Sequence, residues 1–209
     1  MTTVRSPRSR FYDGALYAKF LDPSLTRLHR VVAGFVKSGD RVLDVGCGTG
    51  NLAFLAAEKA GSVVGLELSP AMVEFAETRR RRAAVQNVSF VLGDAASALS
   101  SRPDRSFDTA TMVLALHEMP SVTRGPVLRE LGRLANRILV VDFRVPMPRN
   151  LPGLLNRTAE LTSGREHFRA FRDFNRRGGV PGIAAECGLS CNHRRFINGA
   201  TFEISELSL

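Results

Sequence analysis

Residues 42–51 constrain the fold of this chain more than any other stretch. They open with an apolar run that is typical of a buried strand and continue into a turn with glycine at every second position, at Gly46, Gly48 and Gly50. Glycine lets a backbone turn sharply and come close to a ligand, because it has no Cβ. A flat or charged group is therefore expected to lie on this turn.

Two common glycine-rich sites fit the turn poorly. A dinucleotide fingerprint needs a third glycine at the sixth place, where this chain has Asn51, while Gly50 comes one residue early. A phosphate-binding P-loop ends in Gly-Lys-Ser/Thr, but no lysine follows the glycines before Lys59. Binding of NAD and hydrolysis of a nucleotide are therefore disfavoured.

Two further apolar stretches end in a carboxylate. Residues 62–67 read as a strand that ends at Glu67, from which a carboxylate can accept hydrogen bonds from both hydroxyls of a ribose. Residues 88–93 read as a third strand, followed by Asp94. Ser69 and Pro70 favour a helix start after Glu67, and the arginines 79–82 at the end of that helix are expected to face solvent.

The run Asp-Val-Gly-Cys-Gly-Thr-Gly at residues 44–50 resembles motif I of the class I S-adenosylmethionine-dependent methyltransferases. The resemblance implies that the turn approaches the methionine part of the cofactor, that Asp44 holds its amino group, and that Asp94 meets its adenine. The cofactor contacts that we expect are Tyr17, Asp44, Gly46, Cys47, Gly48, Gly50, Asn51, Glu67, Leu68, Met72, Asp94, Ala95 and Leu114.

The rest of the chain continues the alternation of strands and helices. We expect strands at 107–116, 137–143, 189–197 and 201–207 and helices at 121–136 and 180–188, with a further helix between a cap at Ser163 and a stop at Gly178-Gly179. The Asn198-Gly199 pair favours a hairpin between the last two strands. The sequence thus predicts an α/β, Rossmann-like, seven-stranded and mostly parallel sheet with helices on both faces and a C-terminal antiparallel hairpin.

The pattern predicts a single domain over residues 1–209, and the resemblance to motif I implies that it is a methyltransferase domain. Its expected parts are an N-terminal helical cap at 1–38, a cofactor-binding half at 39–145 and an acceptor-side half at 146–209. The acceptor side begins with a connection that contains proline and glycine. The helix after it has capping-box spacing at Ser163 and Glu166, with phenylalanines on one face and arginines on the other.

His117 and Glu118 are the candidates for acceptor chemistry, because they follow the expected strand 107–116. A neutral imidazole can remove a proton from a phenol, an enol or an activated ring carbon, and Glu118 can orient it. A histidine satisfied by backbone groups is the alternative. The Asn/Asp-Pro-Pro-Tyr/Phe pattern of amino methylation is absent from residues 114–120, which disfavours DNA bases and glutamine amides as acceptors.

The chain carries a formal net charge of +9, and only Lys19, Lys37 and Lys59 of its 29 basic residues are lysines. The layout resembles small-molecule methyltransferases of the ubiquinone/menaquinone-biosynthesis type, which implies an aromatic, quinol-like or lipid-like acceptor. The arginines suit an anionic acceptor, an anionic bilayer surface or RNA, so an RNA methyltransferase is an alternative. A cofactor-binding protein without turnover is the other alternative.

The three cysteines lack zinc-site spacing, so no metal is expected. The expected location of the protein is the cytoplasm.

Overall fold

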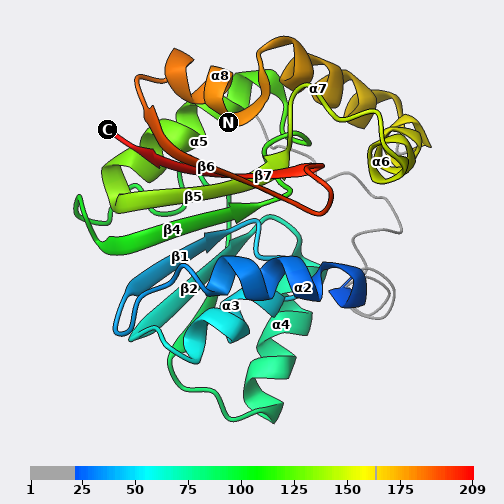
Figure 1. Ribbon diagram of the computed structural model, residues 1–209. Coiled ribbons are helices and arrows are strands. Elements are labelled where there is room, and N and C mark those ends of the chain that lie inside the picture. Colours follow the sequence, from blue (N-terminus) through cyan, green and yellow to red (C-terminus); the bar gives the residue numbers. More distant parts are fainter. Residues whose placement is uncertain (1–21, 163) are drawn as a thin grey trace. The chain divides into compact units, whose positions relative to one another are not determined.

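The computed structural model describes residues 22–162 and 164–209 (Figure 1). Tyr17 and the first 21 residues of the expected helical cap lie outside them. Strand pairing gives a seven-stranded sheet in the order β3-β2-β1-β4-β5-β7-β6, which confirms the predicted Rossmann-like architecture. By its contacts the chain divides into two compact units, residues 1–101 and 102–209.

The first unit alternates helices and parallel strands. Its elements are α2 (Asp22–Ala33), β1 (Arg41–Val45), α3 (Asn51–Ala57), β2 (Ser62–Glu67), α4 (Pro70–Arg82) and β3 (Val88–Leu92). In the register, Val42 of β1 lies beside Val63 of β2, and Val63 lies beside Val88 of β3. These valines form one buried core with Ala53 and other residues, because strands of a parallel sheet are covered on both faces.

The start of α4 is the one that the sequence predicts, whereas its end differs in part. Ser69 caps the helix, since its Oγ accepts a hydrogen bond of 3.4 Å from the nitrogen of Met72, and Pro70 follows at the first helical position. Arg79 differs from the prediction that the arginines 79–82 face solvent. Its Nη1 donates to the carbonyl of Thr49 at 3.0 Å, and its guanidinium lies over the ring of Phe54. The glycine turn is therefore tied to α4.

The second unit carries the C-terminal hairpin. Its elements are β4 (Phe107–Val113), α5 (Ser121–Leu134), β5 (Ala135–Phe143), α6 (Leu151–Thr162), α7 (Arg165–Arg176), α8 (Gly179–Glu186), β6 (Ser190–Ile197) and β7 (Phe202–Ser208). β4 and β5 are parallel, and β7 is antiparallel to both β5 and β6. Asn198 and Gly199 both adopt positive φ, as Asn-Gly hairpin turns require.

Several expected boundaries in this unit are wrong, and one expected connection contains a helix. β4 ends at Val113 rather than at 116, because Leu114 has a φ of +52°, which lies outside the strand region. The helix expected to reach residue 136 ends at Leu134, and β5 begins directly at Ala135. α7 begins at Arg165 with Gly164 at its N-cap, and Ser163, the expected cap, lies outside the described residues. The segment expected to be a connection contains α6.

α7 has the two faces that its sequence predicts. Phe171 and Phe174 are buried, whereas Arg165, Arg169, Arg172 and Arg176 are exposed. The phenylalanines face the core of the second unit, where α7 packs against α5, α6 and α8 (Figure 1). This packing brings side chains of α6 and α7 to the loop that follows β4.

Candidate functional site

The turn after β1 has the backbone shape that alternate glycines allow. Gly46, Gly48 and Gly50 have φ values of +70°, +54° and +80°, a region that side chains with a Cβ rarely adopt. The nitrogen of Gly46 donates to the carbonyl of Leu66 at 2.8 Å, which fixes the start of the turn beside β2. A Cβ added to Gly48 would meet no atom within 4 Å. One side of the turn is therefore open to a ligand.

Glu67, at the end of β2, ties this turn to the start of α4. Its Oε2 accepts a hydrogen bond of 3.0 Å from the nitrogen of Gly48, and its Oε1 accepts bonds of 2.8 and 2.9 Å from the nitrogens of Leu68 and Ser69. A carboxylate offers about four acceptor positions, so these three bonds leave capacity for a ligand hydroxyl. The sequence predicted the ribose contact but not this structural role.

The other expected cofactor contacts of the first unit surround the same strand ends. Asp94 follows β3, and its Oδ1 accepts a hydrogen bond of 2.7 Å from Ala96, which orders the loop that also carries Ala95. Leu68 is 50% exposed beside Glu67, so it offers an apolar surface to a flat ring. Asp44, Cys47 and Met72 are buried.

Asn51, at the start of α3, joins the turn to α2. Its Nδ2 donates to Nδ1 of His29 at 3.0 Å and to Oγ1 of Thr26 at 3.4 Å. Burial lowers the pKa of His29 to about 4, so its imidazole is neutral and its Nδ1 can accept this hydrogen bond. No role for His29 could be predicted from the sequence, because its partner Asn51 is 22 residues away.

In the second unit, His117 is held by Asp142 of β5. The Nδ1 of His117 donates to Oδ1 of Asp142 at 2.7 Å, and the backbone nitrogen of His117 donates to Oδ2 at 3.1 Å. His117 is 3% exposed and Asp142 is fully buried. The ring of His117 lies in edge contact with Phe143, Phe171 and Phe174. Asp142 thus fixes both the position and the tautomer of the imidazole.

The Nε2 of His117 points towards two other carboxylates. Oε1 of Glu118 and Oε1 of Glu160 each lie 3.8 Å from it. Burial alone would lower the pKa of His117, but the charge and hydrogen bond of Asp142, with Glu118 and Glu160, raise it to about 9. Glu160 also accepts a hydrogen bond of 2.5 Å from Nε2 of His167, which raises the pKa of His167.

Arg124 of α5 holds the loop that carries His117. It is 1% exposed, and its guanidinium donates to the carbonyls of Leu116, His117 and Ala170 at 2.9, 3.2 and 2.6 Å. It also pairs with Asp173 of α7 at 2.8 Å. Arg124 therefore fastens the loop after β4 to α7.

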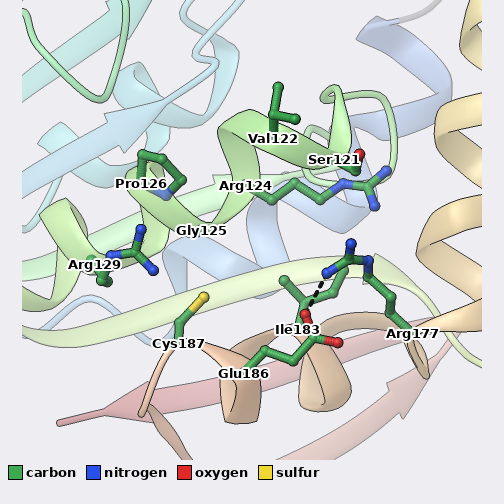
Figure 2. Close-up of a pocket in the computed structure, with 10 residues that line it drawn as sticks. All are labelled: Ser121, Val122, Arg124, Gly125, Pro126, Arg129, Arg177, Ile183, Glu186 and Cys187. Carbon is green, nitrogen blue, oxygen red and sulfur yellow. Dashed lines mark hydrogen bonds and ion pairs between the residues drawn. The ribbon is translucent and has the colours of Figure 1, made fainter.

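A separate pocket of about 170 Å³ lies between α5 and α8 (Figure 2). Arg124, Arg129 and Cys187 line it, together with Arg177 and Glu186, which form an ion pair there. Neither His117 nor Glu118 lines this pocket.

Sequence reasoning missed Asp142, Glu160 and Arg124. Asp142 could have been noticed as a lone carboxylate in the apolar run of residues 138–143. Glu160 lies in α6, whose leucines at 151, 154, 155 and 161 follow helical spacing, although these leucines are exposed. Arg124 carries no signal, since charged residues in the first turns of a helix usually face solvent.

Residues 36–173 match the protein family described as a methyltransferase domain. The glycine turn, the acidic residue that ends the second strand and the seven-stranded sheet agree with this match. The chain therefore belongs to the S-adenosylmethionine-dependent methyltransferases, as its resemblance to motif I implied.

Curated relatives share this domain. The chain is 35% identical over 152 residues to 27-O-demethylrifamycin SV methyltransferase of Amycolatopsis mediterranei. This alignment covers 69% of the chain and 54% of that protein. It is 38% identical over 117 residues to 2-phytyl-1,4-naphtoquinone methyltransferase of Synechococcus elongatus, which covers 53% of this chain and 48% of that protein. The chain thus spans about half the length of these relatives.

Solved structures share the fold. A SAM-dependent methyltransferase from Aquifex aeolicus has a TM-score of 0.68 at 22% identity, with 94% of this chain and 99% of that chain covered. Mitomycin 7-O-methyltransferase MmcR has a TM-score of 0.71 at 18% identity, with 93% of this chain and 56% of that chain covered.

Within the described residues, no helix combines the length and apolarity needed to cross a bilayer.

Proposed function

We propose that this protein transfers the methyl group of S-adenosylmethionine to a small-molecule acceptor with a quinol-like or related aromatic ring. One observation supports the proposed chemistry on the acceptor. His117 follows β4 and is oriented through Nδ1 by the buried Asp142, so that its Nε2 is left for other partners. Methyl transfer needs little from a protein beyond positioning and, for weakly acidic acceptors, a group that accepts a proton.

The first unit supports S-adenosylmethionine as the cofactor. Gly48 leaves one side of the turn open, Glu67 retains acceptor capacity, and Leu68 offers an exposed apolar side chain beside it. These features suit a methionine chain on the turn, ribose hydroxyls at Glu67 and an adenine ring against Leu68, with Asp94 at its amino group. We propose the same role for the remaining expected contacts, Tyr17 and Leu114 included.

In this proposal the bound cofactor supplies a sulfonium-activated methyl group, and the protein acts on the acceptor. His117, in the neutral form that predominates only above about pH 9, contacts the reacting group of the acceptor through Nε2 and takes up its proton, while Glu118 orients that group. Arg124 and Asp142 keep the imidazole in place. Residues 39–145 bind the cofactor in this scheme, and residues 146–209 supply the acceptor side of a single domain.

The names of the relatives support the acceptor class. The relatives described above are named as methyltransferases of 27-O-demethylrifamycin SV and of a 2-phytyl-1,4-naphtoquinone, and a further relative is named as a demethylmenaquinone methyltransferase. The exposed arginines of α7 also suit an anionic acceptor or an anionic surface that holds one. We therefore place quinol-like small molecules before RNA as acceptors.

Calorimetric titration with S-adenosylhomocysteine, S-adenosylmethionine and NAD tests the cofactor. We expect micromolar binding of the two sulfur nucleotides and none of NAD. Absence of binding by both sulfur nucleotides would contradict the proposal.

Methyl transfer to 1,4-naphthoquinols, phenols and RNA then tests the acceptor class. Transfer to a quinol or phenol supports the proposal. RNA binding that weakens steeply with salt, combined with transfer to RNA alone, would support an RNA methyltransferase instead.

A further inference from the structure

Three side chains from three segments of the second unit lie close together. They are His117 in the loop after β4, Glu160 in α6 and His167 in α7, and each offers a ligand atom within 4.8 Å of the other two. We propose that these residues form a binding site for one divalent transition-metal ion such as Zn²⁺. The site lies within the second unit and goes beyond the proposed methyl transfer, which does not require a metal ion.

The donor set is one that such ions prefer. Two imidazoles and one carboxylate hold zinc in catalytic sites, where a fourth position stays open for water or substrate, and imidazole also suits copper, iron and nickel. Calcium and magnesium prefer sites made of oxygen ligands. The set of His117, Glu160 and His167 therefore favours zinc and its neighbours.

The distances are close to those of a coordination sphere. Ligand atoms about 2.0–2.1 Å from a tetrahedral zinc ion lie roughly 3.4 Å apart. In this protein Nε2 of His117 lies 3.8 Å from Oε1 of Glu160, and Nε2 of His167 lies 2.5 Å from Oε2 of Glu160. Rotation of the long Glu160 side chain can equalise these separations with little movement of the backbone.

Burial separates this cluster from ordinary surface charges. His117 and Glu160 are 3% and 7% exposed, and the side chain of His167 is 19% exposed. A carboxylate shared by two imidazoles away from solvent holds an ion with little competition from water. His167 is the most exposed of the three side chains.

Asp142 supplies the outer contact that metal-binding histidines usually have. A histidine that binds a metal through one nitrogen almost always donates its other N–H to a carboxylate or a carbonyl, which orients the ring. The 2.7 Å contact between Nδ1 of His117 and Oδ1 of Asp142 is of this kind. It leaves Nε2, the nitrogen that faces Glu160, as the ligand atom.

Without an ion, the same groups form a hydrogen-bonded pair. Nε2 of His167 then donates to Glu160. An entering ion displaces this proton and any proton on Nε2 of His117, and both are released to the buffer. The consequence for catalysis rests on the proposed function, because an ion on Nε2 would take the lone pair with which His117 accepts a proton.

Metal binding can be measured without cofactor or acceptor. The chain of residues 1–209, freed of metal with a chelator, is titrated with Co²⁺ while the visible d–d absorption is recorded, and with Zn²⁺ by calorimetry. We expect one saturable equivalent and a Co²⁺ spectrum typical of nitrogen and oxygen ligands. His167→Ala and Glu160→Gln should each lower the Zn²⁺ affinity at least about 10-fold, and Asp142→Asn about 10- to 100-fold.

His193→Ala is the matched control, because His193 lies exposed on β6, and it should leave the affinity unchanged. Circular dichroism of each variant shows whether it is folded. Absence of a saturable Co²⁺ spectrum in the parent protein would overturn the proposal, as would equal affinities of folded His167→Ala and His193→Ala. Titration with S-adenosylhomocysteine on the same preparation separates this outcome from failure of the proposed function.

Discussion

Asp142 holds His117 at two points, since one carboxylate oxygen accepts from Nδ1 of the imidazole at 2.7 Å and the other accepts from the backbone nitrogen at 3.1 Å. The same Oδ1 also accepts from the nitrogen of Phe143. The end of β5 thereby determines the conformation of the loop after β4. Effects of substitutions at His117 can for this reason be separated from effects on the loop.

His117→Ala is expected to spare cofactor binding and to lower turnover about 100-fold or more, because it removes the proposed proton acceptor. The measurements are calorimetric affinity for S-adenosylhomocysteine and kcat with the naphthoquinol that the protein methylates. His193→Ala serves as the control. Loss of cofactor affinity and turnover together would indicate a structural histidine instead.

Glu67→Ala should weaken the binding of S-adenosylhomocysteine by about 1–3 kcal/mol, the range for a hydrogen bond left unmade. The variant loses both the proposed ribose contact and the bond that holds Gly48. Glu74→Ala on the exposed face of α4 is the matched control, and its affinity should equal that of the parent. An unchanged affinity for Glu67→Ala would contradict the ribose assignment.

Arg124→Leu should lower the free energy of unfolding by about 3 kcal/mol, because the buried carbonyls of Leu116 and His117, the partly buried carbonyl of Ala170 and the carboxylate of Asp173 lose their donor. Arg129→Leu changes an exposed arginine of the same helix and the same pocket (Figure 2). It should change stability by no more than about 0.5 kcal/mol. Urea denaturation measures the free energy of unfolding of both variants. Equal decreases for the two variants would contradict the role of Arg124 in holding the loop after β4 against α7.

Stability should fall in acid because of His29. Burial lowers its pKa from 6.5 to about 4, so between these values the unfolded chain binds a proton that the folded protein does not. Its contribution is complete above pH 6.5 and is lost as the pH falls towards 4, by about 3 kcal/mol in total. His29→Gln keeps an acceptor for Asn51 but does not titrate.

Urea denaturation of the parent and of His29→Gln between pH 6.5 and 4 measures this difference. All other titrating groups are common to both proteins. The free energy of the variant should depend less on pH than that of the parent. Parallel curves would show that His29 contributes nothing to the acid sensitivity.

The sequence by itself determined the strands and the glycine turn. Residues 42–51 and 62–67 specify buried strands and sharp turns through local composition, and Glu67 ends its strand where the pattern predicts. The Asn198-Gly199 turn is equally local. Such features depend on neighbours along the chain, so one sequence is enough to predict them.

Only the tertiary structure decided which distant side chains meet. Asp142 and Glu160 lie 25 and 43 residues from His117 along the chain, and the strand order and the packing of α6 and α7 bring them to it. The burial that makes Arg124 an anchor and keeps His29 neutral likewise depends on packing. Local sequence patterns do not predict these contacts, because the whole fold determines which side chains are buried and which partners they meet.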